Sequence, residues 1–210
     1  MKKQWNAEEK LQAERALLAQ GYKYVIGVDE VGRGPLAGPV VCAAVIMPLE
    51  ESALIVGVDD SKKLSEKKRE ALAVLIKERA LVYQICELPA ETIDELNILE
   101  ATNLCMKQAV EQLNLPAKKE ECILLTDGNM TLNVDMPQRS LVHGDALSYS
   151  IGSASIIAKV YRDHLMDEYA KTYPHYAFEK NKGYGTAAHI AGIKEHGLCE
   201  IHRRTFTKKF

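Results

Sequence analysis

Hydrophobic and polar positions along the chain follow two periods, one typical of strands and one typical of helices. Apolar runs predict four strands, at residues 24–29, 39–47, 82–88 and 122–126. Apolar positions three or four residues apart, with capping residues before them and glycine or proline after them, predict helices. We expect helices near residues 6–21, 65–81, 97–113, 148–172 and 186–196. Because strands and helices intermingle, the pattern predicts an α/β protein with a mixed sheet.

Composition adds few constraints to this pattern. The 210 residues, 47% hydrophobic and 27% charged, fit one full domain. No apolar stretch approaches the roughly 20 residues that span a bilayer, and the first residues lack the apolar core of a signal peptide. We therefore expect a cytoplasmic protein without membrane contact. The five scattered cysteines form no Cys-x-x-Cys, which favours buried free thiols over zinc ligands or disulfides.

The formal net charge of −2 does not predict a nonspecific nucleic-acid coat. The charge is unevenly distributed, however. From residue 175 to the end the chain has seven lysines and arginines against three glutamates, so this segment is basic while the remainder is acidic.

Two adjacent carboxylates, Asp29 and Glu30, lie where an apolar strand meets the corner Gly32-Arg33-Gly34. Neighbouring carboxylates repel each other and are costly to bury, so this arrangement favours a bound cation. An edge strand that runs into a solvated turn is the alternative. The two glycines around one arginine favour a ligand site, because backbone without a Cβ can approach a ligand closely and a guanidinium binds phosphate.

Two further aspartates extend this pattern. Asp127 follows an apolar strand and precedes a glycine, and Asp145 follows a glycine directly before the long helix. Each one alone is typical of a turn or helix-entry residue, but together they favour a site beyond the strand ends. Oxygen ligands without histidine or thiolate favour magnesium or manganese. Because adjacent strand residues face opposite ways, a metal shared by Asp29 and Glu30 requires the strand to end or bulge there.

Residues 27–41 resemble the opening motif of the type 2 ribonucleases H, in the bacterial RNase HII group. More motifs follow in the family's order and extend over nearly everything after Tyr24: residues 60–65, 127–129, 143–145, 151–163, 181–186 and 201–206. The resemblance implies an RNase H-like fold, with a central mixed β-sheet flanked by helices and a small helical C-terminal part. It also implies three regions: an N-terminal helical extension (1–22), a catalytic domain (23–172) and a basic segment that holds the substrate (173–210).

The same resemblance implies an endonuclease that hydrolyses the RNA strand of RNA–DNA hybrids. It also implies incision 5′ of single ribonucleotides in duplex DNA, a step of ribonucleotide removal in DNA replication and repair. The catalytic and metal-binding residues would be Asp29, Glu30, Asp127 and Asp145, with two Mn²⁺ or Mg²⁺ ions per site. One ion lowers the pKa of the attacking water and the other stabilises the leaving oxygen, which gives 3′-hydroxyl and 5′-phosphate ends.

In this family the ribose 2′-hydroxyl is read by residues that correspond to Gly32, Arg33, Gly34 and Tyr184. Only the 2′-hydroxyl distinguishes RNA from DNA at a given nucleotide, so a backbone corner and an aromatic ring suit this role. A surface aromatic in a glycine-flanked turn is the alternative for Tyr184.

Four basic residues are candidates for phosphate contacts. We expect Lys62 and Lys63 to contact the substrate backbone, and Arg203 and Arg204 are further candidates. A merely solvated run of charges is the alternative for all four. Asp163 lies four residues after Lys159, which favours a structural ion pair over a metal contact.

Some positions depart from the family's pattern. His143 replaces a usual lysine, Gly152-Ser153 replaces an alanine pair and Thr205 replaces a serine. None of these changes removes a carboxylate, although the histidine would weaken a phosphate or metal-shell contact. RNase HIII, the sister type, usually has threonine at the position of Arg33 and carries a sizeable N-terminal domain. This sequence has arginine there and only 23 residues before Tyr24, which disfavours an assignment to RNase HIII.

Three other functions remain as alternatives. A junction resolvase-like nuclease would lack the 2′-hydroxyl reader, and a noncatalytic hybrid-binding module would have lost its carboxylates. Nucleotide binding by the glycine corner would need G-x-G-x-x-G or Walker spacing, which is absent. We expect a monomer, and the sequence after Phe206 shows no clear clamp-binding peptide.

Overall fold

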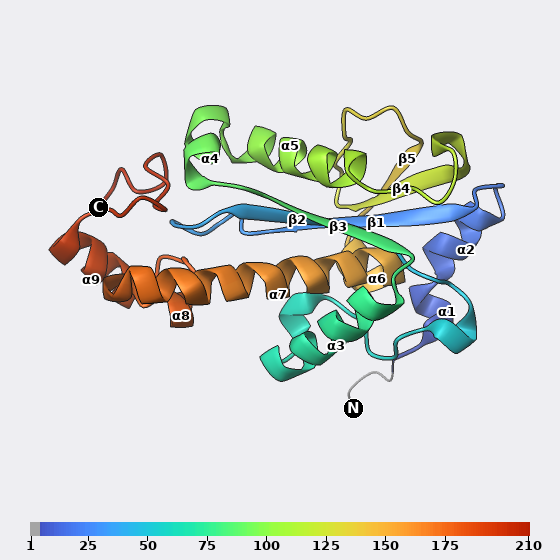
Figure 1. The fold of residues 1–210 in the computed structure, drawn as a ribbon, viewed down its shortest axis with the longest axis horizontal. Coiled ribbons are helices and arrows are strands. Elements are labelled where there is room, and N and C mark those ends of the chain that lie inside the picture. The colour runs from blue at the N-terminus through green and yellow to red at the C-terminus, as the bar shows by residue number, and fades with distance from the viewer. Residues whose placement is uncertain (1–4) are drawn as a thin grey trace.

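A computed structural model describes residues 5–210, so the first four residues of the expected N-terminal extension lie outside the described part (Figure 1). Five strands form one mixed sheet in the order β3-β2-β1-β4-β5. Their bounds are β1 Tyr24–Val31, β2 Val40–Ile46, β3 Val82–Leu88, β4 Cys122–Asp127 and β5 Gln138–Leu141. β2 runs antiparallel to both β1 and β3, whereas β1, β4 and β5 run parallel to one another.

Helices cover both faces of this sheet (Figure 1). α4 (Ala90–Leu96) and α5 (Ile98–Glu111) lie on one face, and α3 (Glu66–Arg79) and the long α7 (Tyr149–Thr172) lie on the other. α8 (Phe178–Asn181) and α9 (Ala187–His196) continue beyond one end of the sheet, near the C-terminus. α1 (Ala7–Lys10) and α2 (Gln12–Leu18) lie at the opposite end, and α6 (Gly144–Leu147) directly precedes α7. Short 3₁₀ turns complete the chain: η1 Glu51–Ala53, η2 Ser61–Lys63, η3 Lys119–Glu121 and η4 Pro174–Tyr176.

The two central strands are buried on both faces and divide the core in two. Ile26 and Val28 of β1 pack in the cluster under α5, whereas Val41 and Ala43 of β2 pack in the cluster under α3 and α7. The start of α7 approaches β1 closely, since a Cβ on Gly27 would lie 2.2 Å from the carbonyl carbon of Ser150. This approach brings α7 against the strand that carries the first two candidate carboxylates.

The helix caps predicted at Asn6, Ser65 and Asn97 are confirmed. Their side-chain oxygens accept backbone N–H groups from the first turns of α1, α3 and α5, and Ser148 and Thr186 cap α7 and α9 in the same way. An oxygen in this position satisfies an N–H that has no partner within the helix. The cysteines are also free, as expected, and four of the five are buried.

The structure corrects several other predictions. The first helix is two helices that meet at Leu11. The sequence pattern missed α4 and β5, because both are short and β5 (QRSL) has no buried residue to mark its faces.

Within residues 5–210, no helix is both long and apolar enough to cross a membrane. The division at residues 22 and 172 stays a prediction.

Candidate active site

Two of the candidate aspartates lie at the ends of neighbouring parallel strands. The pairing of β1 with β4 ends at Val28 and Thr126, so Asp29 and Asp127 are the next residues along the two strands. Parallel neighbours are about 4.8 Å apart and direct their side chains to the same face. That face is the one covered by α7, whose Ser155 side chain lies near Asp29 and partly offsets the rise in its pKa. Asp29 is only 5% exposed.

The adjacent Glu30 projects to the other face of β1. The expectation that the strand ends or bulges here is wrong, because β1 pairs regularly with β2 through Asp29, Glu30 and Val31. Only the β4 side of β1 loses its partner after Val28. The opening of the site therefore comes from the end of β4, not from a distortion of β1. The Glu30 carboxylate lies 3.5 Å from Nη1 of Arg33.

Asp145 reaches the same place from α6. The backbone N–H of Gly144, the residue before it, donates to Oδ1 of Asp127 at 2.6 Å. This bond fixes the start of α6 beside the end of β4. On its other side Asp145 has Lys62 of η2, whose Nζ lies 3.9 Å from Oδ2. The structure thus brings all four predicted carboxylates to one edge of the sheet.

Burial and mutual repulsion raise the pKa values of three of these carboxyls. The pKa of Asp29 lies well above its usual range because of burial and then the neighbouring charge of Glu30. Burial also raises the pKa of Glu30, with Asp127 adding to the effect and Arg33 opposing it. The pKa of Asp145 rises through burial and the charges of Asp60 and Asp127, against Lys62. A cluster of this kind is stabilised by a cation.

The donor set fits hard divalent cations. The four carboxylates supply oxygen ligands, and such ligands suit Mg²⁺ and Mn²⁺. Across residues 5–210, no three or more His, Cys, Asp or Glu side chains are grouped closely enough to hold a metal ion by themselves. This arrangement suits an ion that keeps water and substrate phosphate among its ligands, as Mg²⁺ does in phosphate-handling sites.

A cleft of about 260 Å³ opens beside the carboxylates. Its lining joins parts of the chain that are far apart in sequence: Glu30 to Gly34, Ser61, Lys62, Ser155, Lys159 and Tyr184. Tyr184 is 46% exposed, and its Cε1 would lie 3.6 Å from a Cβ added to Gly34. The glycine-arginine corner and the tyrosine predicted to read the 2′-hydroxyl therefore face a common space.

The sequence did not predict that Ser155 and Lys159 line the site. Ser155 and Lys159 both lie on α7, four residues apart and so on one face of the helix. Ser155 donates to the hydroxyl of Ser61 at 3.0 Å, which ties α7 to the 3₁₀ turn that carries Lys62. The only sequence signal for Ser155 was its position inside the family motif at residues 151–163. A serine in a helix does not by itself indicate a site.

The other predicted basic contacts separate into different environments. The Lys62 and Lys63 side chains are 81% and 60% exposed, and Lys63 Nζ lies 3.7 Å from Asp60. Arg204 is exposed. Arg203 is fully buried and donates to the carbonyls of Gly32, Arg33 and Gly38. Arg203 as a phosphate contact is therefore wrong, and its role is to hold the glycine corner.

Asp163 makes the ion pair that the sequence favoured. Its Oδ1 lies 2.6 Å from Nζ of Lys159, and its Oδ2 lies 3.7 Å from Nη2 of Arg69.

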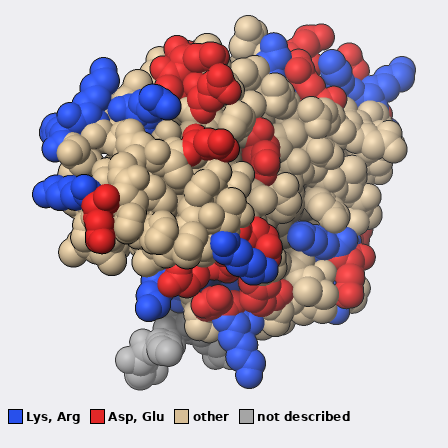
Figure 2. All heavy atoms as spheres, turned by 60° about the vertical axis from the view of Figure 1, so that its left-hand side comes forward, with Lys and Arg blue, Asp and Glu red and all other residues tan. Residues whose placement is uncertain are grey.

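Figure 2 shows lysine and arginine side chains interspersed with aspartate and glutamate side chains on the face it presents, separated by uncharged surface. The interspersed charges agree with the small net charge of the sequence.

Comparison with known proteins gives a consistent result. A family model described as Ribonuclease HII matches residues 26–209. The ribonuclease HII of Ligilactobacillus salivarius (strain UCC118) is 50% identical over 199 residues, which cover 95% of this chain and 75% of that protein. The ribonuclease HII of Geobacillus sp. (strain WCH70) is 52% identical over 206 residues, which cover 98% of this chain and 71% of that protein.

Solved structures show the same fold at lower sequence identity. Ribonuclease H2 from Pyrococcus horikoshii OT3 superposes with a TM-score of 0.72 at 24% identity, over 88% of this chain and 94% of that one. The RNase HIII designated Bst, solved in complex with Mn²⁺, gives a TM-score of 0.65 at 20% identity, over 84% of this chain and 64% of that one. The predicted RNase H-like fold is thus confirmed.

Proposed function

This chain belongs to the ribonuclease HII family of endonucleases, which cleave the RNA strand of RNA–DNA hybrids, and we propose that it also incises duplex DNA 5′ of single ribonucleotides. The proposed reaction is phosphodiester hydrolysis at two divalent cations that leaves a 3′-hydroxyl and a 5′-phosphate. The observation that supports it best is the common cleft of Glu30, the Gly32-Arg33-Gly34 corner and Tyr184. In this cleft a reader of the sugar borders the acidic cluster directly.

The four carboxylates are the proposed metal ligands. Asp29, Glu30, Asp127 and Asp145 would hold Mg²⁺ or Mn²⁺, which when bound supply an activated water and stabilise the leaving oxygen. The raised pKa values of Asp29, Glu30 and Asp145 support this proposal, because their charges lack sufficient compensation from the protein alone. The manganese complex of the Bst RNase HIII also supports divalent ions for this chain.

The cleft supports the proposed recognition of the ribose. The exposed Arg33 and Gly34 present backbone at its wall, and Tyr184 offers an exposed ring opposite that backbone. Backbone groups there can hydrogen-bond a 2′-hydroxyl while the tyrosine packs against the sugar. A deoxyribose would leave these polar groups without a partner, which costs binding energy. Discrimination between RNA and DNA follows from that cost.

Phosphate positioning is the proposed role of Lys62, with Lys63 as a second contact. The Lys62 ammonium is exposed and lies beside Asp145, so it can bind the phosphate that enters the acidic cluster and reduce the repulsion between them. The basic segment 173–210 would hold the duplex around this point. We further propose that the protein acts as a monomer in the cytoplasm, where its substrates arise.

The decisive experiment compares three labelled duplexes: one DNA with a single ribonucleotide, an all-DNA control and an RNA–DNA hybrid. Each is incubated with Mg²⁺, Mn²⁺ or chelator. We expect metal-dependent incision 5′ of the ribonucleotide and loss of cleavage in Asp29→Asn. Equal cutting of the all-DNA control would reject the sugar-reading role of the cleft. Tight hybrid binding without any cleavage would instead favour a noncatalytic binding module.

A further inference from the structure

The side chain of Lys10, at the end of α1, connects two loops that carry site residues. It is only 11% exposed, and its Nζ lies 2.8 Å from Oδ1 of Asp59 and also donates to the carbonyl of Ala146. Asp59 lies two residues before the η2 turn that carries Lys62, and Ala146 immediately follows Asp145. The buried Lys10 ammonium therefore links the segment that leads into η2 to α6. η2 carries Lys62 and α6 carries Asp145, and the charged groups of these two residues lie 3.9 Å apart.

A second polar contact ties α2 to the start of α7. Glu14 is fully buried, and its Oε1 accepts the Ser148 hydroxyl at 2.6 Å and the Ser150 N–H at 2.9 Å. Ser148 is the N-cap of α7, with its Oγ accepting the N–H of Ile151. A carboxylate at this end interacts favourably with the helix dipole as well as with the free N–H groups. Glu14 thus fixes the chain where α6 passes into α7.

These contacts are costly in isolation. The second oxygen of Glu14 and the hydroxyl of Ser150 are buried without a hydrogen-bond partner among the described residues. A buried polar atom without a partner lowers stability, and an apolar pair at these positions would avoid that cost. Proteins keep such costly buried polar groups mainly at functional sites, where the groups hold a required geometry.

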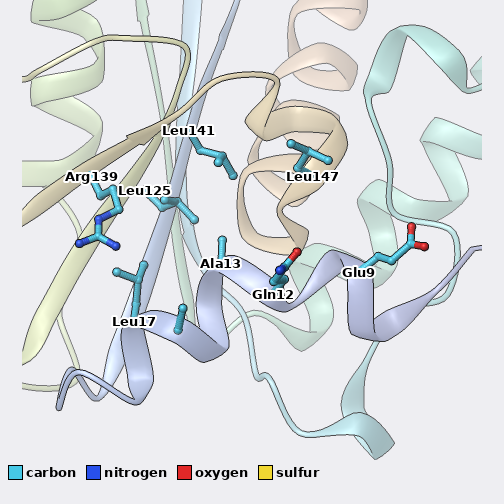
Figure 3. A pocket seen from close by; sticks show the side chains of 9 residues that line it. Glu9, Gln12, Ala13, Leu17, Leu125, Arg139, Leu141 and Leu147 are labelled. Atoms are coloured by element: carbon cyan, nitrogen blue, oxygen red, sulfur yellow. The ribbon is translucent and has the colours of Figure 1, made fainter.

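Apolar packing alone does not hold α6 against the N-terminal helices. Figure 3 shows Ala13 and Leu17 of α2 on one side of a cavity, with Leu141 and Leu147 on the other. The cavity measures about 290 Å³, and the Leu147 side chain of α6 remains half exposed. Because these surfaces do not close on each other, the polar contacts of Lys10 and Glu14 add to the attachment of this segment.

The attachment matters because Asp145 is under repulsion. The like charges of Asp60 in the η2 turn and Asp127 at the end of β4 both act on its carboxylate and repel it. The N–H of Gly144 holds α6 on the β4 side, and Lys10 holds it on the opposite side through Ala146. Loss of Lys10 removes the attachment through Ala146 and leaves α6 held by the Gly144 bond and by the Glu14 contacts that follow it.

We propose that Lys10 and Glu14 of the N-terminal helices are positioning residues that hold the Asp145 turn in its metal-binding place. The inference rests on the proposed role of Asp145 as a metal ligand. It gives the N-terminal helical extension a function in the reaction, although neither residue touches substrate or metal. The effect should therefore appear in metal affinity and in the mobility of residues 144–150, not in duplex affinity.

The test uses Lys10→Met, which keeps the length of the side chain and removes its charge. Arg15→Met is the matched control, because Arg15 lies on α2 and pairs with the exposed Glu51 at 2.8 Å, away from the site loops. Two quantities are measured: hydrogen exchange of the amides of 144–150 in the metal-free protein, and the Mn²⁺ concentration that gives half-maximal cleavage. We expect Lys10→Met to raise both by about 10-fold with KM for the duplex unchanged, and Arg15→Met to change neither.

Glu14 provides a second, independent pair of variants if Lys10→Met folds poorly. Glu14→Gln retains an oxygen that can accept from Ser148 and Ser150, so it should resemble the wild type in both measurements. Glu14→Ala removes the acceptor and should raise exchange and the Mn²⁺ requirement. Equal behaviour of the Gln and Ala variants, or of Lys10→Met and Arg15→Met, would overturn the inference.

The variant Asp145→Asn separates this inference from the proposed function. If Asp145→Asn cleaves like the wild type, the proposed metal role of Asp145 is wrong and the inference is rejected together with it. If Asp145→Asn is inactive while Lys10→Met matches its control, only the positioning role of the N-terminal helices is rejected.

Discussion

Nε2 of His189 lies 3.0 Å from Nε2 of His202 in the interior of the C-terminal part. Nδ1 of His189 lies 2.9 Å from the carbonyl of Tyr184 and must donate to it, so Nε2 of the neutral ring is an acceptor. His202 then donates through Nε2 and accepts the N–H of Cys199 at Nδ1. This chain of hydrogen bonds, which ends on the backbone of the proposed sugar reader, requires both histidines to be neutral.

The neutral pair predicts a loss of stability in acid. Burial, and then the neighbouring His189, lowers the pKa of His202 to about 4, from about 6.5 in the unfolded chain. The unfolded state therefore binds more protons between these values, and stability falls as the pH drops from 6.5 toward 4, by at most on the order of 3 kcal/mol. Urea unfolding at a series of pH values measures this slope.

Two variants separate this effect from other titrations. His202→Gln should be less stable at pH 7 but should show a shallower decline between pH 6.5 and 4. His164→Gln is the control, because His164 is exposed and pairs with Glu70. An unchanged slope in His202→Gln would show that other groups cause the loss in acid.

A substitution in the carboxylate cluster should raise the stability of the metal-free protein instead of lowering it. The folded-state pKa of Asp29 is raised by burial and by Glu30, so its charge costs stability at every pH above that pKa. Asp29→Asn should therefore stabilise the metal-free protein at pH 7 by about 1–2 kcal/mol, with cleavage lost. Differential scanning calorimetry with and without Mn²⁺ measures this. Mn²⁺ should raise the Tm of the wild type more than that of the variant.

A control for this prediction is Asp135→Asn, in the exposed loop between β4 and β5. It should leave both the Tm and its response to Mn²⁺ unchanged. If Asp29→Asn instead lowers the Tm in the absence of metal, the favourable contacts of the Asp29 carboxylate outweigh the repulsion.

Local sequence patterns predicted the acidic site because its geometry follows from strand ends. Asp29 and Asp127 each terminate an apolar run, and parallel strands bring such ends to one edge of a sheet. The helix caps were predictable because Ser65 and Asn97 hydrogen-bond backbone N–H groups only two or three residues further along the chain. The path of β1 beyond Asp29 was not predictable, because it depends on the pairing with β2.

Contacts between distant segments set the remaining features. Arg203 and Arg204 are adjacent and identical in type, yet the first is buried and the second is exposed. Only the path of the C-terminal segment past residues 32–38 decides which of the two faces inward. Lys10 likewise reads as an ordinary surface charge of a helix, and its partner Ala146 lies 136 residues away.

The glycine corner predicts different outcomes for two alanine substitutions. Gly32 has φ +94°, and a Cβ there would lie 2.7 Å from the carbonyl oxygen of Pro39. Gly32→Ala should therefore destabilise the fold by about 2–4 kcal/mol. A Cβ on Gly34 would meet only the Tyr184 ring, at 3.6 Å, so Gly34→Ala should stay within about 0.5 kcal/mol of the wild type.

The two variants then differ in what their activity reports. Gly34→Ala puts a methyl group into the cleft and should slow incision at a single ribonucleotide by about 10- to 100-fold, while binding of all-DNA duplex is unchanged. Single-turnover cleavage and thermal unfolding of both variants check this. Wild-type cleavage by a folded Gly34→Ala would place the sugar reader elsewhere.

The buried Arg203 predicts a cost for even a conservative change. Its guanidinium donates to the carbonyls of Arg33 at 3.0 Å, Gly32 at 2.5 Å and Gly38 at 2.8 Å. A lysine ammonium donates from a single atom and cannot reach all three, so Arg203→Lys leaves a carbonyl unpaired and should lose about 2–4 kcal/mol of stability. Lys208→Gln, at an exposed position, should lose less than about 0.5 kcal/mol. Wild-type stability of Arg203→Lys combined with weaker hybrid binding would restore the phosphate contact as the role of Arg203.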